Sequence, residues 1–323
     1  EILIGLVGSE MCIRDRLKPM GEDYKGTNLS QKFIDAHRDI LDPDGDGTID
    51  VAGGMHDAGD HVKFCLPGSY AASTLGWGYY EFRDAYVDSG QQWHIEDILH
   101  WFNDYYLKCT YFDENGDILA FCYQVGEGDI DHNYWNAPEL QNESLLDFAR
   151  PAYFATVETP ASDMCAGVAA SLAVNYLNFK DTEPEYAKRC LNTAVKMYEF
   201  AVKTHSEAED GKTVTSLGYD GGFYTSSYDY DELAWAAVWL YECTGEYDYI
   251  NDIIAVDENT SGDMGAHPYT GYLKRIIADT GNCWQNIWVH CWDTVWGGVF
   301  AKLAPITNTA RDWYISVSYT HLT

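Results

Sequence analysis

The sequence predicts an all-α protein built from antiparallel helical hairpins, and three observations support this. Apolar residues recur at the i, i+3, i+4, i+7 spacing of one helix face over most of the chain. Strand signals are few, and only residues 118–124 are expected to form a short strand. Long loops rich in Asp, Gly, Tyr and Trp separate the helices, and such loops in a compact domain are usually functional.

Eight helices are expected along the chain. Their ranges are 70–86, 94–109, 162–179, 183–205, 231–244, 246–256, 272–279 and 292–304. Asp88-Ser89-Gly90 breaks the chain between the first two helices, and Gly245 separates 231–244 from 246–256. Thr182 is expected to cap the helix at 183–205, which carries Pro184 in its first turn. No linker or low-complexity tract interrupts the pattern, which indicates one domain.

The composition excludes several classes of partner. The 323 residues contain 20 Lys+Arg and 51 Asp+Glu, a formal charge of −31. A surface this acidic repels phosphate backbones and anionic lipids, so we expect no nucleic-acid or membrane partner, and no obligate protein partner is evident. The 25 Tyr and 11 Trp exceed what a core requires, and such flat amphipathic rings suit a surface on which sugar rings stack.

The cysteines indicate neither a metal site nor a redox motif. They fall at positions 12, 65, 109, 122, 165, 190, 243, 283 and 291. None forms a CxxC pair, and their spacing resembles no disulfide framework. Cysteine usage therefore leaves the cellular compartment undecided.

The segment Asp50–Phe64, DVAGGMHDAGDHVKF, carries the clearest chemical signal. Asp57 and Asp60 lie three residues apart, and glycines around them allow the backbone to turn tightly and approach a ligand. Both carboxylates can then point at one water molecule, and an ionised Asp is a workable general base for activating it. The alternative is a capped surface turn, in which Asp and Gly cluster for local reasons alone.

This segment resembles the nucleophilic-water loop of family 9 glycoside hydrolases, the cellulase family of inverting endoglucanases. The similarity continues through LPGSYAASTLGWGYYEF, GDIDHNYW, RPAYFAT, FYTSS, DELAWAAVWLY and NIWVHCWD. The resemblance implies an (α/α)6 toroid, extracellular location and cleavage of β-1,4-glucan with inversion at the anomeric carbon. It also implies that Asp60 is the catalytic base and that Asp57 helps to hold the attacking water.

Inversion requires a second, protonated carboxylic acid about 6.5–9.5 Å from the base. In the family this acid is a Glu in an N-E-V-A-like stretch that follows a His/Arg substrate-binding region, and neither stretch occurs here. We therefore expect residues 17–315 to be a truncated catalytic domain, an incomplete toroid that is inactive alone. Residues 1–16 and 316–323 resemble translated sequencing-adapter scars and are expected to be artefactual.

Substrate contacts are implied by the same resemblance. His132 and Trp135 match glucose-binding positions on a cleft loop, Trp288 matches a stacking platform, and Phe223 and Tyr224 match an aromatic pair lining the cleft. A Trp face contacts the C–H surface of a glucose ring, while His and Tyr donate hydrogen bonds to hydroxyls. The alternative for each aromatic residue is core packing, and for Phe223 the two interpretations stay open.

Two acidic groups suggest calcium, and no organic cofactor is expected. Asp231 and Glu232, with Asp293, resemble a family calcium site, although acidic residues that simply open a helix are an equal alternative. Residues 42–50 fit the first half of an EF-hand or dockerin loop, but position 12 of that loop is Gly53 in place of an acid. We interpret these residues as a turn leading into the Asp57–Asp60 loop.

Three functional hypotheses follow. The first is a glycosidase catalytic domain acting on β-glucan. The second is a non-catalytic β-glucan-binding protein on the same toroid, which has no need for the adjacent carboxylates Asp57 and Asp60. The third, a calcium-dependent assembly module, depends only on residues 42–50. The paired carboxylates favour the first hypothesis.

Overall fold

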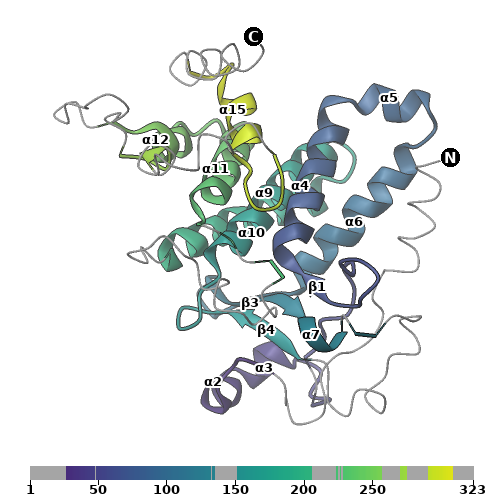
Figure 1. The fold of residues 1–323 in the computed structure, drawn as a ribbon, viewed down its shortest axis with the longest axis vertical. Coiled ribbons are helices and arrows are strands. Elements are labelled where there is room, and N and C mark those ends of the chain that lie inside the picture. The colour runs from purple at the N-terminus through teal and green to yellow at the C-terminus, as the bar shows by residue number, and fades with distance from the viewer. Residues whose placement is uncertain are drawn as a thin grey trace.

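The fold is a layer of parallel helices capped at one end by a small sheet. The computed structural model describes residues 27–47, 49–131, 133–134, 151–205, 223–224, 226, 228–256, 270–274 and 290–307. Within these ranges four inner helices pack side by side, and outer helices cover them (Figure 1). The inner helices are α4 (Cys65–Glu81), α9 (Ser162–Phe179), α11 (Tyr230–Thr244) and α15 (Trp296–Leu303). The outer helices are α6 (Gln92–Lys108), α10 (Pro184–Thr204) and α12 (Asp248–Ile254).

Helices α4 and α9 approach closely because small residues line their contact. A Cβ atom on Gly76 would lie 2.7 Å from Cγ1 of Val174, and one on Gly167 would lie 2.4 Å from Oγ of Ser69. The two contacts join residues that are equally far apart along the chain, so α4 and α9 run parallel. Every residue of α9 except Tyr176 is buried, as expected for a helix flanked on all sides.

Helix α11 continues the parallel layer beside α9. The Ser162 hydroxyl donates to Oδ2 of Asp229 where the two helices begin. Further along, the Cys243 thiol donates to the Ala173 carbonyl at 3.2 Å. One contact joins the starts of the two helices and the other joins residues further along both, so α9 and α11 are also parallel.

Helix α15 extends the layer on the other side of α11. The backbone N–H of Val295 donates to Oδ2 of Asp231 at 2.8 Å, which joins the starts of the two helices. A Cβ on Gly298 would lie 2.9 Å from the Trp235 ring, so a small residue again permits close packing. The chain therefore returns to the same end of the layer before each inner helix.

The outer helices lead the chain from the end of one inner helix back toward the start of the next, so they run antiparallel to their inner neighbours. Tyr79, near the end of α4, donates to Glu96 near the start of α6, whereas Gly68 lies against Tyr106 at the other end. Helix α10 has one buried face and one exposed face, which is the amphipathic pattern of an outer helix. Gly245 ends α11 in a left-handed conformation with φ of 74°, and α12 follows.

A four-stranded antiparallel sheet lies at the end where the inner helices begin (Figure 1). Its strands are β1 (Lys63–Phe64), β2 (Thr110–Phe112), β3 (Ile118–Val125) and β4 (Ala152–Ala155). Strands β1 and β2 pair with successive parts of one edge of β3, and β4 pairs with the other edge. β1 runs directly into α4, which fixes the sheet against the helices.

The remaining short helices lie near this sheet or extend α4. They are α2 (Gln31–Ala36), α3 (Arg38–Leu41), α5 (Arg83–Asp88) and α7 (Gly128–Asp131). One large hydrophobic core joins the inner helices to the sheet, and a smaller cluster lies between α4, α6 and the start of α10. Among the helices in the described ranges, none is both long and apolar enough to cross a lipid bilayer.

The predicted helices are largely confirmed, with several corrections. The ranges 162–179 and 94–109 match α9 and α6 closely, and the strand predicted at 118–124 is β3. Strands β1, β2 and β4 were not predicted, because two to four residues are too few to show a periodicity. Residues 275–279 of the helix expected at 272–279 lie outside the described residues.

Two local predictions were wrong. The N-cap of α10 is Glu183, and the Thr182 hydroxyl donates backward to the Phe179 carbonyl at 3.4 Å instead of capping the helix. Pro184 does occupy the first turn, as predicted. The last helix starts at Trp296 and not at Trp292, because residues 291–294 form a turn closed by a Cys291–Thr294 bridge.

Replacing Gly76 with Ala is expected to destabilise the protein by about 1–3 kcal/mol, because the new Cβ would overlap Val174 in a packed interface. Gly78→Ala is a matched control on the same helix, since its Cβ would meet only the Tyr86 hydroxyl at 3.8 Å. That control should be neutral or stabilising by up to about 1 kcal/mol from helix propensity. Urea unfolding of both variants measures the difference, and equal midpoints would contradict the close α4–α9 contact.

Candidate active site

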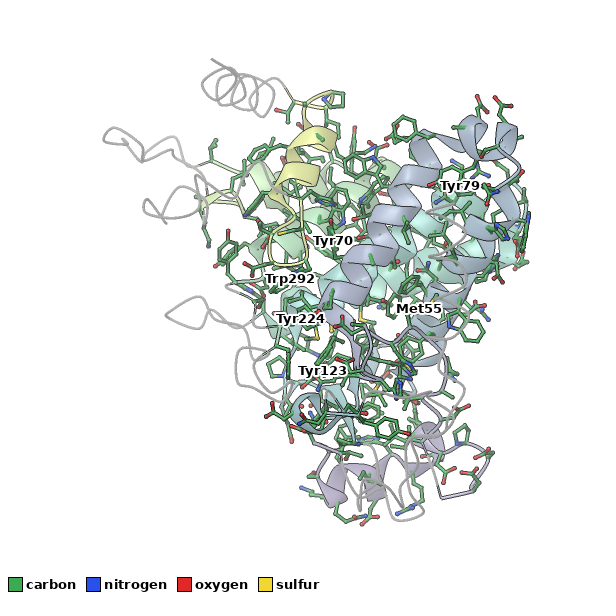
Figure 2. The ribbon with its side chains drawn as sticks, turned by 45° about the vertical axis from the view of Figure 1, so that its right-hand side comes forward. Met55, Tyr70, Tyr79, Tyr123, Tyr224 and Trp292 are labelled. Atoms are coloured by element: carbon green, nitrogen blue, oxygen red, sulfur yellow. The ribbon has the colours of Figure 1, made fainter. Side chains whose placement is uncertain are left out.

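The segments that precede the inner helices meet at one end of the layer. Because the inner helices are parallel, their N-terminal ends lie together, and so do residues 51–64, 223–224, 228–229 and 290–295. Figure 2 shows Tyr224 and Trp292 close together where the helices adjoin the sheet. This end therefore gathers side chains that are far apart in the sequence.

Asp57 and Asp60 lie on a tightly closed loop before β1. The Asp57 N–H donates to the Val62 carbonyl at 2.9 Å, and the Val62 N–H donates to Oδ1 of Asp60 at 3.3 Å. Asp57 is half-buried, whereas Asp60 is only 3% exposed. The loop thus holds one carboxylate inside the fold and one at its edge.

Tyr224 contacts this loop from the segment before α11. Its hydroxyl donates to Oδ2 of Asp57 at 2.7 Å. Burial, the Asp57 hydrogen bond and the charges of Asp57 and Asp60 all raise the pKa of Tyr224. The phenol therefore stays protonated and remains a donor, which fixes the orientation of the Asp57 carboxylate.

Aromatic rings surround Tyr224. Its ring lies 5.0 Å from that of Phe64 and 5.0 Å from that of Trp292, both edge to face. Phe223, the neighbouring residue, is 38% exposed and its ring lies 6.1 Å from Phe64. Of the predicted pair, Tyr224 therefore contacts Asp57, and Phe223 beside it exposes part of its surface, which a ligand can contact.

The loop backbone is held from behind by α6 and by Lys63. Gly53 and Gly54 both have positive φ, and a Cβ on Gly54 would lie 2.8 Å from the Tyr105 ring. The Trp101 indole N–H donates to the Gly54 carbonyl at 2.7 Å. The Lys63 ammonium donates to the carbonyls of Val51 and Gly53 and lies over the Tyr105 ring. These contacts attach the loop backbone to α6 and to the start of β1.

A pocket of about 270 Å³ opens beside Asp57. Its walls include Phe64, Ala71 and Leu75 from β1 and α4, and Phe102 from α6. A mostly apolar recess with a carboxylate at its edge is typical of a small-molecule site.

Three of the predicted substrate-binding residues, His132, Trp135 and Trp288, lie outside the described residues.

Two residues at the site were missed by the sequence reasoning. Trp292 was assigned to a helix, and the turn at 291–294 instead carries its ring to Tyr224. Lys63 gave no distinct signal, because a Lys beside a strand is normally a solvated surface residue, whereas here it is buried.

Asp231 and Glu232 form a pair of buried carboxylates at the start of α11. Oδ1 of Asp231 and both carboxylate oxygens of Glu232 are buried without a hydrogen-bond partner. Burial raises the pKa of Asp231 to about 7, and burial together with the charge of Asp231 raises the pKa of Glu232 well above its usual range. Two such oxygen-rich groups fit a hard cation such as Ca²⁺, which would remove the cost of burying them.

Asp293 lies in the turn before α15, and its charge also raises the pKa of Asp231. Its carboxylate is not within ligand spacing of both others, since in the described part of the chain only Asp42, Asp44 and Asp46 have carboxylate oxygens all within 4.8 Å of one another. Carboxylate oxygens of Asp42 and Asp44 already accept hydrogen bonds from the backbone N–H groups of Asp46 and Gly47, which agrees with the interpretation as a turn.

The chain matches one known protein family over nearly its whole length. The family model for glycosyl hydrolase family 9 matches residues 21–321. The chain belongs to glycosyl hydrolase family 9. Members of this family form an (α/α)6 barrel, and the parallel inner helices with antiparallel outer partners are part of that arrangement. The predicted toroid is thereby confirmed.

Several relatives of this chain are named endoglucanases. The chain is 37% identical to Endoglucanase A of Bacillus pumilus over 211 residues, which is 65% of this chain and 30% of that protein. The catalytic domain of Clostridium thermocellum CelT superposes with a TM-score of 0.73 at 40% identity, covering 94% of this chain and 56% of that one. Endoglucanase CelQ of the same organism, solved with cellotetraose, has a TM-score of 0.60 at 30% identity, covering 81% of this chain and 37% of that one. The chain thus spans about a third of the curated relatives it matches.

Gly54→Ala is expected to destabilise this family 9 chain more than Gly53→Ala. Both changes place a Cβ on left-handed backbone, which costs about 1–2 kcal/mol. Only the Cβ at Gly54 also overlaps the Tyr105 ring, adding about 1–3 kcal/mol, whereas the one at Gly53 lies 3.7 Å from that ring. Thermal unfolding of the two variants measures the difference. An equal decrease in Tm for both would show that Tyr105 does not restrain the loop.

Proposed function

We propose that the protein to which this chain belongs hydrolyses β-1,4-glucosidic bonds with inversion, and that Asp60 is the general base. The observation that carries this proposal is the loop that holds Asp57 and Asp60 beside Tyr224. In this role Asp60 accepts a proton from the attacking water, while Asp57 accepts a hydrogen bond from the same water and holds it. The Tyr224 hydroxyl keeps Asp57 in the required orientation.

The substrate is a β-glucan in this proposal. The relatives named as endoglucanases, and the solved CelQ complex with cellotetraose, support a chain of β-1,4-linked glucose. Phe223, Tyr224 and Trp292 supply ring faces or edges near the carboxylates, and His132, Trp135 and Trp288 are proposed as further sugar contacts. We also propose that the protein acts outside the cell, because a polymeric glucan does not cross the membrane.

Inverting hydrolysis also requires a protonated acid about 6.5–9.5 Å from the base. We assign no Glu of this chain to that role and expect the 323 residues alone to release no sugar. The hydrolysis experiments therefore use a complete family 9 catalytic domain that carries this segment, and binding of cellotetraose by calorimetry is measured on the chain itself.

Asp60→Ala is expected to lower hydrolysis of carboxymethylcellulose by at least about 10²-fold, because the general base contributes about 10²–10⁴-fold. Asp88→Ala is the matched control, since Asp88 is an exposed carboxylate at the far end of α5 and should leave the rate unchanged. Reducing-sugar release measures both. A wild-type rate in the Asp60 variant would exclude the assigned base, and binding of cellotetraose without any hydrolysis by the complete domain would favour the glucan-binding alternative.

Tyr224→Phe is expected to lower kcat about 10-fold with a smaller change in KM. It removes the donor to Oδ2 of Asp57, and a hydrogen bond to a charged group contributes about 1.5–3 kcal/mol. Tyr70→Phe is the control, because its hydroxyl donates at a similar distance of 2.8 Å to the His290 carbonyl. Equal kinetics for the two variants would argue against a positioning role for Tyr224.

We propose in addition that Asp231 and Glu232 hold a structural Ca²⁺ beside the site, and that the Asp293 carboxylate moves to join them when the ion binds. The support is that Oδ1 of Asp231 and both carboxylate oxygens of Glu232 are buried without a hydrogen-bond partner. Bound there, Ca²⁺ would join the start of α11 to the turn before α15, and so stabilise the segments that carry Tyr224 and Trp292.

Calcium in 100-fold excess over its Kd should stabilise the folded chain by about 2.7 kcal/mol. The Tm in CaCl₂ is therefore expected to exceed that in EGTA by several degrees. Glu232→Gln should abolish the difference, whereas Asp44→Asn, in the exposed 42–46 turn, should keep it. A calcium-dependent Tm that disappears only in the Asp44 variant would place the ion in the turn and contradict the proposal.

A further inference from the structure

Two cysteines face each other where α6 meets the sheet. Cys109 ends α6, and Cys122 lies in the middle of β3. The Cys122 N–H donates to the Cys109 carbonyl at 3.0 Å, and the adjoining residues Thr110 and Phe121 are the first partners in the β2–β3 ladder. Residues opposed in this way, with a ladder hydrogen bond between them, have Cα atoms about 5.5 Å apart, which is a usual Cα separation in a disulfide.

The two thiols are enclosed together. Both are free in the structure, and their residues are 0% and 1% exposed. Burial alone would raise the pKa of Cys109, but the neighbouring Cys122 side chain and the charges of Lys63 and Lys108 lower it below its usual range. Burial and the neighbouring Cys109 raise the pKa of Cys122. Each thiol thus changes the pKa of the other, which agrees with their opposition across the ladder.

We propose that Cys109 and Cys122 form an intramolecular disulfide that ties the end of α6 to strand β3. With oxidised glutathione as the oxidant, the Cys109 thiolate attacks one glutathione sulfur and releases one glutathione thiolate. The Cys122 thiol then loses its proton, attacks the Cys109 sulfur and releases the second glutathione thiolate. Two cysteine thiols are oxidised by two electrons, and one glutathione disulfide is reduced to two thiols.

This bond would join two elements that hold the Asp57–Asp60 loop in place, helix α6 and strand β3. Helix α6 supplies Trp101 and Tyr105, which contact the glycine pair of the loop. Strand β3 pairs with β1, which directly follows the loop, through Lys63 and Val125. Because both sulfurs are buried, exchange with glutathione takes place while the segment is open, before β3 packs against α6.

The bond is tested by peptide mapping of the full chain. The protein is unfolded, refolded in a mixture of reduced and oxidised glutathione, and treated with N-ethylmaleimide in denaturant. Trypsin leaves both cysteines in one peptide because residues 109–149 contain no Lys or Arg, so cleavage after Glu114 is needed to separate them. We expect two peptides joined through Cys109 and Cys122, both protected from the reagent. Full alkylation of both residues, or a disulfide between the buried Cys65 and Cys165, would overturn the proposal.

Thermal unfolding tests whether the bond ties the fold together. The refolded wild-type protein should lose several degrees of Tm when dithiothreitol is added, because reduction frees the short loop between the two residues. Cys122→Ser should show no response to dithiothreitol, and Cys190→Ser, at a buried thiol on α10, should respond as the wild type does. A Tm that is the same in oxidised and reduced wild-type protein would contradict the stabilising role.

Discussion

The close parallel packing of α4 against α9 is the contact on which the rest of the structure depends. It exists because Gly76 and Gly167 have no side chains at the points where Val174 and Ser69 cross the interface. Once these two helices are parallel, α11 and α15 extend the layer in the same direction, and every connecting segment must return to one end. The loop with Asp57, the segment with Tyr224 and the turn with Trp292 therefore meet without being near each other in the sequence.

The same arrangement gives a physical reason for part of the high acidity. Parallel helices present their N-terminal ends together, and each end carries partial positive charge and unpaired N–H groups. Buried carboxylates accumulate there, including Asp163, Asp231 and Glu232 in the first turns of α9 and α11. Some of the 51 acidic residues thus lie inside the fold, where they can form hydrogen bonds or hold a cation.

The Asp57–Asp60 loop is restrained by side chains from two sides. Behind it, Tyr105 fills the space that Gly54 leaves open, and Lys63 binds the loop carbonyls. In front of it, Tyr224 donates to Asp57. Catalytic groups must be held within a fraction of an ångström of the productive geometry, and a loop fixed by packed side chains meets that requirement without forming part of a helix or strand.

The sequence by itself determined the helical class, most helix positions and the pair Asp57 and Asp60, because a 3.6-residue period and a glycine-flanked acidic motif are local properties. It did not predict strands β1, β2 and β4, whose few residues pair only through neighbours far along the chain. The contact of Tyr224 with Asp57, the place of Trp292 and the opposition of Cys109 and Cys122 were likewise decided by the tertiary structure alone. Each of these joins elements whose relative position is set by helix packing and strand register, and no spacing in the sequence encodes that position.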